Sequence, residues 1–180
     1  MTPEEFRKEI IPEGRRLYSF AFRFLNIREE AEDLVQDVMT KLWEERGTLG
    51  NYRNIKALAT TMTRNMCIDR LRKKKTLGID DNEIHSIAGE TESTGQVIER
   101  EEAASLVNTI IGRMKEPGKS ALIMRDIEGY SYEETAEVLE MNVIALRTLI
   151  SRARKSVREE MINIYSYGTG KDKGAAFKIL

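Results

Sequence analysis

Apolar side chains recur at the spacing of an α-helix through most of the first 75 residues. Three amphipathic helices are predicted there, over residues 3–25, 28–45 and 55–75. The first is expected to bend near Pro12 and Gly14, and a loop of residues 48–54 precedes the third. The expected core consists of the apolar residues on these helices: Leu17, Phe20, Ala21, Phe24, Leu25, Ala31, Leu34, Val35, Val38, Leu42, Ile55, Leu58, Ala59, Met62 and Met66.

Helical periodicity is lost between residues 76 and 95, where Gly, Ser, Thr, Asp and Glu dominate. This composition predicts a flexible acidic linker, because such a segment has too little apolar surface to bury. Further helices are predicted over residues 96–114, after Pro117, and over 132–140 and 143–165. The tail of residues 166–180 contains three glycines and is expected to fray.

The predicted fold class is all-α, with two small helical domains at residues 1–75 and 96–165. A chain of 180 residues is long enough for two such domains, each with a modest core. Apolar residues make up 41% of the chain and charged residues 33%, which is typical of a globular protein. No stretch approaches the roughly 20 apolar residues that a membrane span requires. The N-terminal residues lack an apolar signal core, so we expect a cytoplasmic protein without membrane insertion.

The sequence contains few residues suited to catalysis or metal binding. Cys67 is the single cysteine, and it fits a core position in a reducing compartment. His85 is the single histidine and falls in the predicted linker. Metal-ligand spacing, a phosphate-binding loop and a nucleophile motif are all missing. We therefore expect neither an enzyme nor a cofactor nor a metal site.

The net charge of −1 conceals strong segregation of charge along the chain. Residues 64–75 carry six basic residues and one acid, and residues 143–158 carry five basic residues and no acid. Residues 28–45 carry seven acids and two basic residues. Two basic surfaces and one acidic helix predict at least two different macromolecular partners.

Residues 131–154 fit a helix-turn-helix, in which a second helix enters the major groove of DNA. Ser131 and Glu134 have the spacing of a capping box, and the small Ala136 falls where the two helices would cross. Glu140 lies in the turn, where a left-handed backbone would cost a non-glycine residue about 1 kcal/mol. A helical hairpin with a solvated basic face is the alternative. The polar residues expected to face duplex DNA are Arg147, Thr148, Ser151, Arg152, Arg154 and Lys155.

Three segments, in this order, resemble the extracytoplasmic function (ECF) sigma factors of the sigma-70 family. They are residues 31–44 (AEDLVQDVMTKLWE), residues 65–73 (NMCIDRLRK) and residues 126–155, which include the helix-turn-helix. The resemblance covers roughly residues 17–158. It implies a dissociable specificity subunit of RNA polymerase, with the first domain as region 2 and the second as region 4.

The resemblance implies that the helix of residues 31–44 binds the coiled-coil clamp of the polymerase's largest subunit. The outward residues follow helical spacing and form an acidic stripe, which suits a basic partner. A merely solvated helix face is the alternative. The predicted polymerase-binding residues are Asp33, Gln36, Asp37, Thr40 and Glu44.

The loop before the third helix, and that helix itself, resemble the part of the family that opens and recognises the −10 promoter element. Capture of a separated strand requires basic charge and a stacking surface. Tyr52 is suited equally to base stacking and to core packing, and Asp69 is suited to orienting an arginine. The predicted −10 contacts are Asn51, Tyr52, Arg53, Asn54, Arg64, Asn65, Arg70, Arg72 and Lys73.

The resemblance thus implies binding to core RNA polymerase, to promoter DNA as duplex and single strand, and to an anti-sigma factor. The family often has a basic residue where Leu149 stands, so its −35 specificity does not transfer to this chain. A conventional helix-turn-helix regulator that never binds polymerase is the alternative function. Such a regulator would leave the first domain unexplained, and it would usually bind DNA as a dimer.

Overall fold

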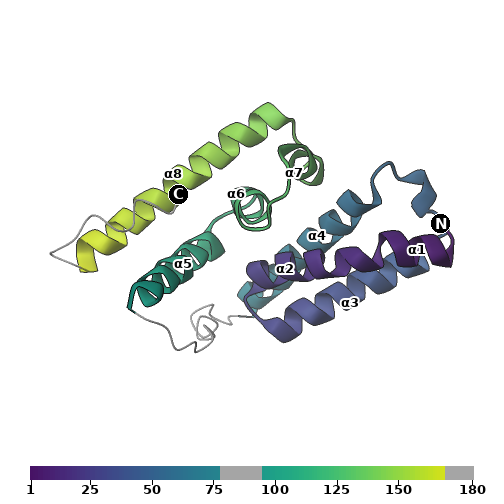
Figure 1. Cartoon of the computed structure of the whole chain (residues 1–180), viewed down its shortest axis with the longest axis horizontal. Coiled ribbons are helices and arrows are strands. Elements are labelled where there is room, and N and C mark those ends of the chain that lie inside the picture. Colours follow the sequence, from purple (N-terminus) through teal and green to yellow (C-terminus); the bar gives the residue numbers. More distant parts are fainter. Residues whose placement is uncertain (78–94, 169–180) are drawn as a thin grey trace.

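The computed structural model describes residues 1–77 and 95–168, and the elements within these ranges are helices and turns (Figure 1). The first 77 residues form an N-terminal module. Its helices are α1 (Pro3–Glu9), α2 (Gly14–Leu25), α3 (Arg28–Glu44) and α4 (Ile55–Thr76). The bend predicted near Pro12 is a short 3₁₀ turn, η1 (Ile11–Glu13), which separates α1 from α2. Proline lacks the N–H that a continuous helix would need at this point.

The core of the N-terminal module lies where α2 packs against α3 and α4. The apolar residues predicted for α2 and α3 are buried, among them Phe20, Leu34 and Leu42, each at 0% exposure. Helix α4 differs from the prediction. Its most buried side chains include Thr63 and Cys67, and the Thr63 hydroxyl donates to the carbonyl oxygen of Ala59 at 2.8 Å. Four apolar residues of this helix that were predicted for the core are only half-buried: Ile55, Leu58, Met62 and Met66.

The second half of the chain forms a C-terminal module of helices and one π-helical segment, which confirms the all-α, two-domain fold. Its elements are α5 (Gly95–Arg113), α6 (Gly118–Leu122), η4 (Ile123–Ile127), α7 (Tyr132–Val138) and α8 (Val143–Gly168). Helix α8 continues past residue 166, where the tail was predicted to begin. Most of the predicted linker and the rest of that tail lie outside the described residues.

The two modules pack against each other, which a flexible linker did not predict. Helix α7 contacts α4, and α5 and η4 contact α2. Lys119 lies at this boundary with only 4% of its surface exposed. Its Nζ donates to the carbonyl oxygens of Phe24, at 3.2 Å, and Gly112, at 3.0 Å. These carbonyls belong to the last turns of α2 and α5, where the helix dipole favours a cation. The buried ammonium therefore joins one helix end from each module.

Candidate nucleic-acid and polymerase interfaces

The predicted helix-turn-helix is present in α7, a short turn and α8. Ser131 caps α7: its Oγ accepts from the backbone N–H of Glu134 at 3.0 Å. The Glu134 carboxylate accepts in turn from the Ser131 N–H at 2.7 Å, so the capping box is confirmed. Ala136 is 4% exposed, and its carbonyl accepts from the N–H of Met141 at 2.9 Å. A small residue at this position lets the chain turn back closely toward the second helix.

The turn between the helices uses a left-handed residue. Glu140 has φ 52°, the strained conformation considered for this position. A non-glycine residue in this conformation costs about 1 kcal/mol, so hydrogen bonds of the neighbouring residues must stabilise the turn. Asn142 follows, and its Oδ1 accepts from the backbone N–H of Ala145 at 2.7 Å. This bond caps the start of α8 and fixes its first turn.

Helix α8 has one buried face and one exposed polar face. Leu146 and Ile150 are buried against the rest of the module. All six residues predicted to face duplex DNA are exposed. Arg154 is also held from within the module, since its guanidinium donates two hydrogen bonds to Asp126 at 2.6 and 2.8 Å. This pairing raises the pKa of Arg154, so its charge is fixed and its side chain is oriented.

Two residues predicted to contact the −10 element are engaged by the C-terminal module. Asn54 caps α4 through its Oδ1, while its Nδ2 donates to Glu137 of α7 at 2.7 Å. The guanidinium of Arg64 donates to Ser120 Oγ and to Glu116 Oε2, both at 2.9 Å. The structure thus brings these residues to the boundary between the modules rather than to open solvent.

The other residues predicted for the −10 element lie on the outside of the N-terminal module. Tyr52 is 48% exposed, so its ring is available for stacking and is not part of the core. Asp69 accepts from Arg72 at 2.9 Å, as expected for a residue that orients an arginine. Arg70 is half-buried, whereas the remaining members of the set are exposed: Asn51, Arg53, Asn65, Arg72 and Lys73.

The acidic stripe of α3 is exposed along its length, at Asp33, Gln36, Asp37, Thr40 and Glu44. The guanidinium of Arg70 donates to Asp37 at 3.2 Å and to the backbone oxygen of Glu30 at 2.8 Å. Basic α4 and acidic α3 are therefore connected on the surface of the same module.

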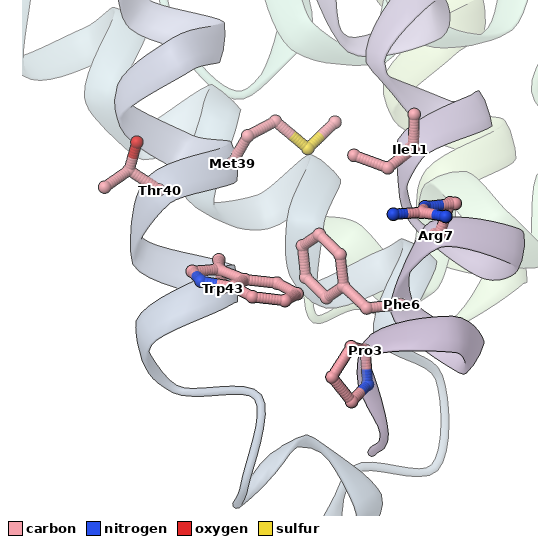
Figure 2. A pocket seen from close by; sticks show the side chains of 7 residues that line it. All are labelled: Pro3, Phe6, Arg7, Ile11, Met39, Thr40 and Trp43. Atoms are coloured by element: carbon pink, nitrogen blue, oxygen red, sulfur yellow. The ribbon is translucent and has the colours of Figure 1, made fainter.

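Next to Thr40, an open apolar hollow of about 370 Å³ lies between α1 and α3 (Figure 2). The Phe6 ring meets Trp43 edge to face at 5.2 Å between centroids. Phe6 is buried, whereas Trp43 stays 41% exposed beside the acidic stripe.

The contacts between the modules are the functional feature that sequence reasoning missed. Arg16 of α2 donates to both carboxylate oxygens of Glu134, at 3.1 and 3.4 Å, and its guanidinium lies 3.5 Å from the centre of the Tyr130 ring. Burial opposes ionisation of Glu134, but the hydrogen bonds from Arg16 and from Ser131 outweigh it and lower the pKa of Glu134. Ser19 donates to Glu128 at 2.8 Å. No local pattern marks these residues, because their partners lie more than 100 positions away along the chain.

Cys67 lies in the core, as predicted, with 0% exposure. Burial raises the pKa of its thiol to about 12, and the charges of Lys119 and Glu116 also act on it. Both of these charged residues belong to the C-terminal module, so the thiol lies close to the boundary between the modules. Within the described ranges, no group of three His, Cys, Asp or Glu side chains is arranged to hold a metal ion. No helix there has the length and apolar character that crossing a membrane requires.

Comparison with known proteins matches both modules to one family. The family model for sigma-70 region 2 covers residues 12–76, and that for sigma-70 region 4 covers residues 105–157. The ECF RNA polymerase sigma factor SigM of Mycobacterium tuberculosis is 30% identical over 146 residues, which are 78% of this chain and 68% of SigM. The chain belongs to the ECF sigma factors of the sigma-70 family.

Other ECF sigma factors and their relatives support the assignment. The RNA polymerase sigma-H factor of Pseudomonas aeruginosa is 27% identical over 154 residues, covering 79% of this sigma factor and 78% of sigma-H. Two solved structures share the fold. RpoE of Bartonella quintana, in complex with the anti-sigma factor NepR, has a TM-score of 0.65 at 22% identity over 88% of this chain and 98% of RpoE. CnrH, in complex with the cytosolic domain of CnrY, has a TM-score of 0.64 at 19% identity over 90% of each chain.

Proposed function

We propose that this sigma factor binds core RNA polymerase through the acidic stripe of α3 and directs it to promoters through α8 and α4. The observation that carries the proposal is the sorting of charge by surface. Helix α3 presents exposed acids, whereas α8 presents a basic face on a capped helix-turn-helix. Acids suit a basic protein partner, and a basic recognition helix suits the major groove of a duplex. We also propose that the chain acts in the cytoplasm and has no catalytic activity of its own.

Strand separation at the −10 element would be driven by binding alone. Tyr52 offers an exposed ring on which a base can stack, and neighbouring arginine and asparagine side chains offer charge and hydrogen bonds. Captured bases stabilise the opened DNA without any covalent step. Because the basic residues of α4 and α8 would contact phosphates, promoter binding should weaken steeply as the salt concentration rises.

The two modules must separate before both promoter elements are bound. The −10 and −35 elements lie about 25 base pairs apart, which is about 85 Å along B-DNA. The longest helix of the chain, α8, has 26 residues and is about 39 Å long, less than half of that distance. We infer that the packed modules do not reach both elements at once. Separation would also release Asn54 and Arg64 from Glu137, Ser120 and Glu116.

The packed arrangement is also suited to regulation. RpoE, a solved structure of the same fold, is a complex with the anti-sigma factor NepR, and CnrH is a complex with the cytosolic domain of CnrY. We propose that an anti-sigma factor binds this chain as well and holds the modules together, which would keep Arg64 away from DNA. Such a protein should bind the packed form more tightly than the separated form.

The proposed function is tested by transcription in vitro with core RNA polymerase on genomic DNA, with and without this chain. New start sites that depend on the chain are expected. An Asp37→Arg variant should bind core polymerase at least about 100-fold more weakly, because like charges across an interface cost several kcal/mol. Asp37 is a largely exposed residue paired with Arg70, so the fold should tolerate the change.

Glu32→Arg is the matched control for this test. Glu32 lies on the same helix, is exposed, and is also paired with an arginine, Arg28, at 2.9 Å. It lies outside the proposed stripe, so core binding should stay within about twofold of the original value. Normal binding of the Asp37→Arg variant to core polymerase would show that α3 is not the binding surface. A dimer that binds paired half-sites without polymerase would point instead to a conventional regulator.

A further inference from the structure

Ile144 is an apolar side chain at the tip of the recognition helix α8. It is 79% exposed, the highest value among the large apolar side chains in the described part of the chain. Single exposed apolar residues are common on protein surfaces, so exposure alone assigns no role. The position of Ile144 is more informative. It is the second residue of α8 after the cap at Asn142, in a turn held by two hydrogen bonds.

Ile144 shares a helix face with the polar residues proposed to contact DNA. Arg147, Thr148 and Ser151 follow it at i+3, i+4 and i+7, which places all four on one side of α8. Leu146 and Ile150 occupy the opposite, buried side. In a helix-turn-helix, the N-terminal residues of the second helix are those that reach base edges. If α8 binds duplex DNA as proposed above, Ile144 therefore enters the major groove with the polar residues.

The chemistry of Ile144 restricts what it can recognise. Its side chain has no hydrogen-bond donor or acceptor, so it cannot pair with the polar edge of a base. The 5-methyl group of thymine is the apolar feature that the four bases display in the major groove. We propose that Ile144 contacts the methyl group of a thymine in the −35 element and thereby determines specificity at that base pair. Isoleucine is branched at Cβ and keeps one main rotamer in a helix, so the contact needs little ordering.

This inference rests on the proposed function of α8, and the experiment separates the two. Promoters are first identified by mapping the start sites that holoenzyme uses. Each thymine in either strand of the −35 element is then replaced by deoxyuridine, which keeps the hydrogen-bonding edge and lacks only the methyl group. At one position, deoxyuridine should weaken holoenzyme binding about fourfold, as expected for exposing one methyl group.

The protein variants identify the side chain that contacts this methyl group. Holoenzyme with Ile144→Ala should bind thymine and deoxyuridine promoters equally well, whereas Ile144→Val should keep most of the difference. Ile162→Ala is the matched control. Ile162 is an exposed isoleucine on the same helix, 45% exposed and about 27 Å further along its axis, so this variant should keep the full fourfold difference.

Several results would overturn the inference. One is a −35 element without thymine, or one in which no deoxyuridine substitution weakens binding. Another is equal sensitivity of the original protein and of Ile144→Ala, because a different side chain would then contact the methyl group. A holoenzyme that is indifferent both to the −35 sequence and to Arg147→Ala would instead remove the proposed role of α8 itself, and the inference with it.

Discussion

The two surfaces proposed to bind nucleic acid differ in how they are held. On α8, Arg147, Thr148 and Ser151 are exposed on a capped helix that needs no rearrangement to meet a duplex. On α4, Arg64 is only 16% exposed and is bonded to Glu116 and Ser120 of the other module. In the proposed mechanism, recognition of duplex DNA is available in the packed form, whereas complete capture of a separated strand also needs Arg64, which is released only when the modules come apart. Separation of the modules therefore precedes promoter opening in the proposed mechanism.

The contact between the modules depends largely on weak interactions and should be reversible. The Arg16–Glu134 pair is 33% and 44% exposed, and surface ion pairs of this kind contribute at most about 1 kcal/mol each. Interfaces between domains of one chain generally resemble transient protein interfaces. Two contacts are more buried: the Lys119 ammonium lies between two helix ends, and the Arg64–Glu116 pair is 16% and 27% exposed. Because the contacts are few, a partner such as polymerase can shift the equilibrium between packed and separated modules.

The largest expected effect concerns the thiol at the boundary between the modules. The pKa of Cys67 is raised from 9.0 to about 12, which lowers the thiolate fraction at pH 8 about 1000-fold. Alkylation of Cys67 by iodoacetamide should therefore be at least about 1000-fold slower in the native protein than in concentrated urea. Peptide mapping by mass spectrometry measures the rate. Assembly with core polymerase and promoter DNA should accelerate the reaction, because the modules then separate.

Leu77→Cys provides an internal control for the labelling experiment. Leu77 is 75% exposed, so a cysteine there should react at the same rate in the native protein and in urea. Equal rates for Cys67 in the two conditions would show that the thiol is not buried in the native protein. In that case the contrast between the α4 and α8 surfaces would not hold for the free protein.

The next effect concerns the exposed surface of α8. Arg147→Ala should weaken binding to a −35 duplex by about 5- to 150-fold, the loss that one specific side-chain contact to a base causes. The free energy of unfolding of this variant should fall by at most about 1 kcal/mol, because the side chain is exposed and its guanidinium lies 5.0 Å from the centre of the Tyr132 ring. Fluorescence anisotropy with promoter and scrambled duplexes measures the binding.

Arg158→Ala is the charge-matched control on the same helix, outside the predicted contact set. It removes one positive charge and should weaken binding to both duplexes equally and only slightly. If Arg147→Ala also affects both duplexes equally, Arg147 contacts phosphate and not a base. If neither variant changes binding, the exposed face of α8 is not the DNA surface.

The features predicted well from the sequence depend on neighbours along the chain. The Ser131–Glu134 capping box and the exposed stripe from Asp33 to Glu44 follow from spacing within one helix. A left-handed Glu140 follows from its place in the turn of the helix-turn-helix, where glycine is usual because the backbone often has a positive φ. Local spacing fixes which side of a helix a residue occupies, so such predictions need no knowledge of the tertiary structure.

The features that were missed depend on contacts between distant segments. Helix α4 packs against α2 and α3 of its own module and against α7 of the other module. Its buried positions are therefore set by more than one partner: Thr63 is fully buried, whereas Leu58 and Met62 are only half-buried. A single apolar stripe therefore could not describe this helix. The role of Lys119 was also missed, because it donates to backbone carbonyls, which no sequence pattern marks. The sequence predicted which residues form the candidate site, but it did not predict which of them are engaged at the boundary between the modules.

The smallest effect, and the sharpest test of the contrast between α4 and α8, comes from Glu116. Its carboxylate accepts from Arg64 at 2.9 Å and from Ser120 at 2.7 Å, and Glu116→Gln removes the charge while keeping the shape. The amide that replaces the carboxylate can still accept from Arg64, so the packed form should lose about 1 kcal/mol, the difference between a charge-assisted and a neutral hydrogen bond. This raises the population of separated modules about fivefold. Permanganate reactivity of unpaired thymines at the −10 element should rise by a similar factor, and binding to the −35 duplex should not change.

The direction of two effects decides how this last result is interpreted. Arg64→Ala breaks the same ion pair from the other side, but it also removes a residue proposed to contact the opened strand. Glu116→Gln should therefore increase promoter opening while Arg64→Ala decreases it, although both loosen the packed form. Glu133→Gln, at an exposed acid of the same module, should leave opening unchanged. If Glu116→Gln and Arg64→Ala shift opening in the same direction, the contact between the modules does not compete with DNA for Arg64, and the two surfaces differ only in exposure.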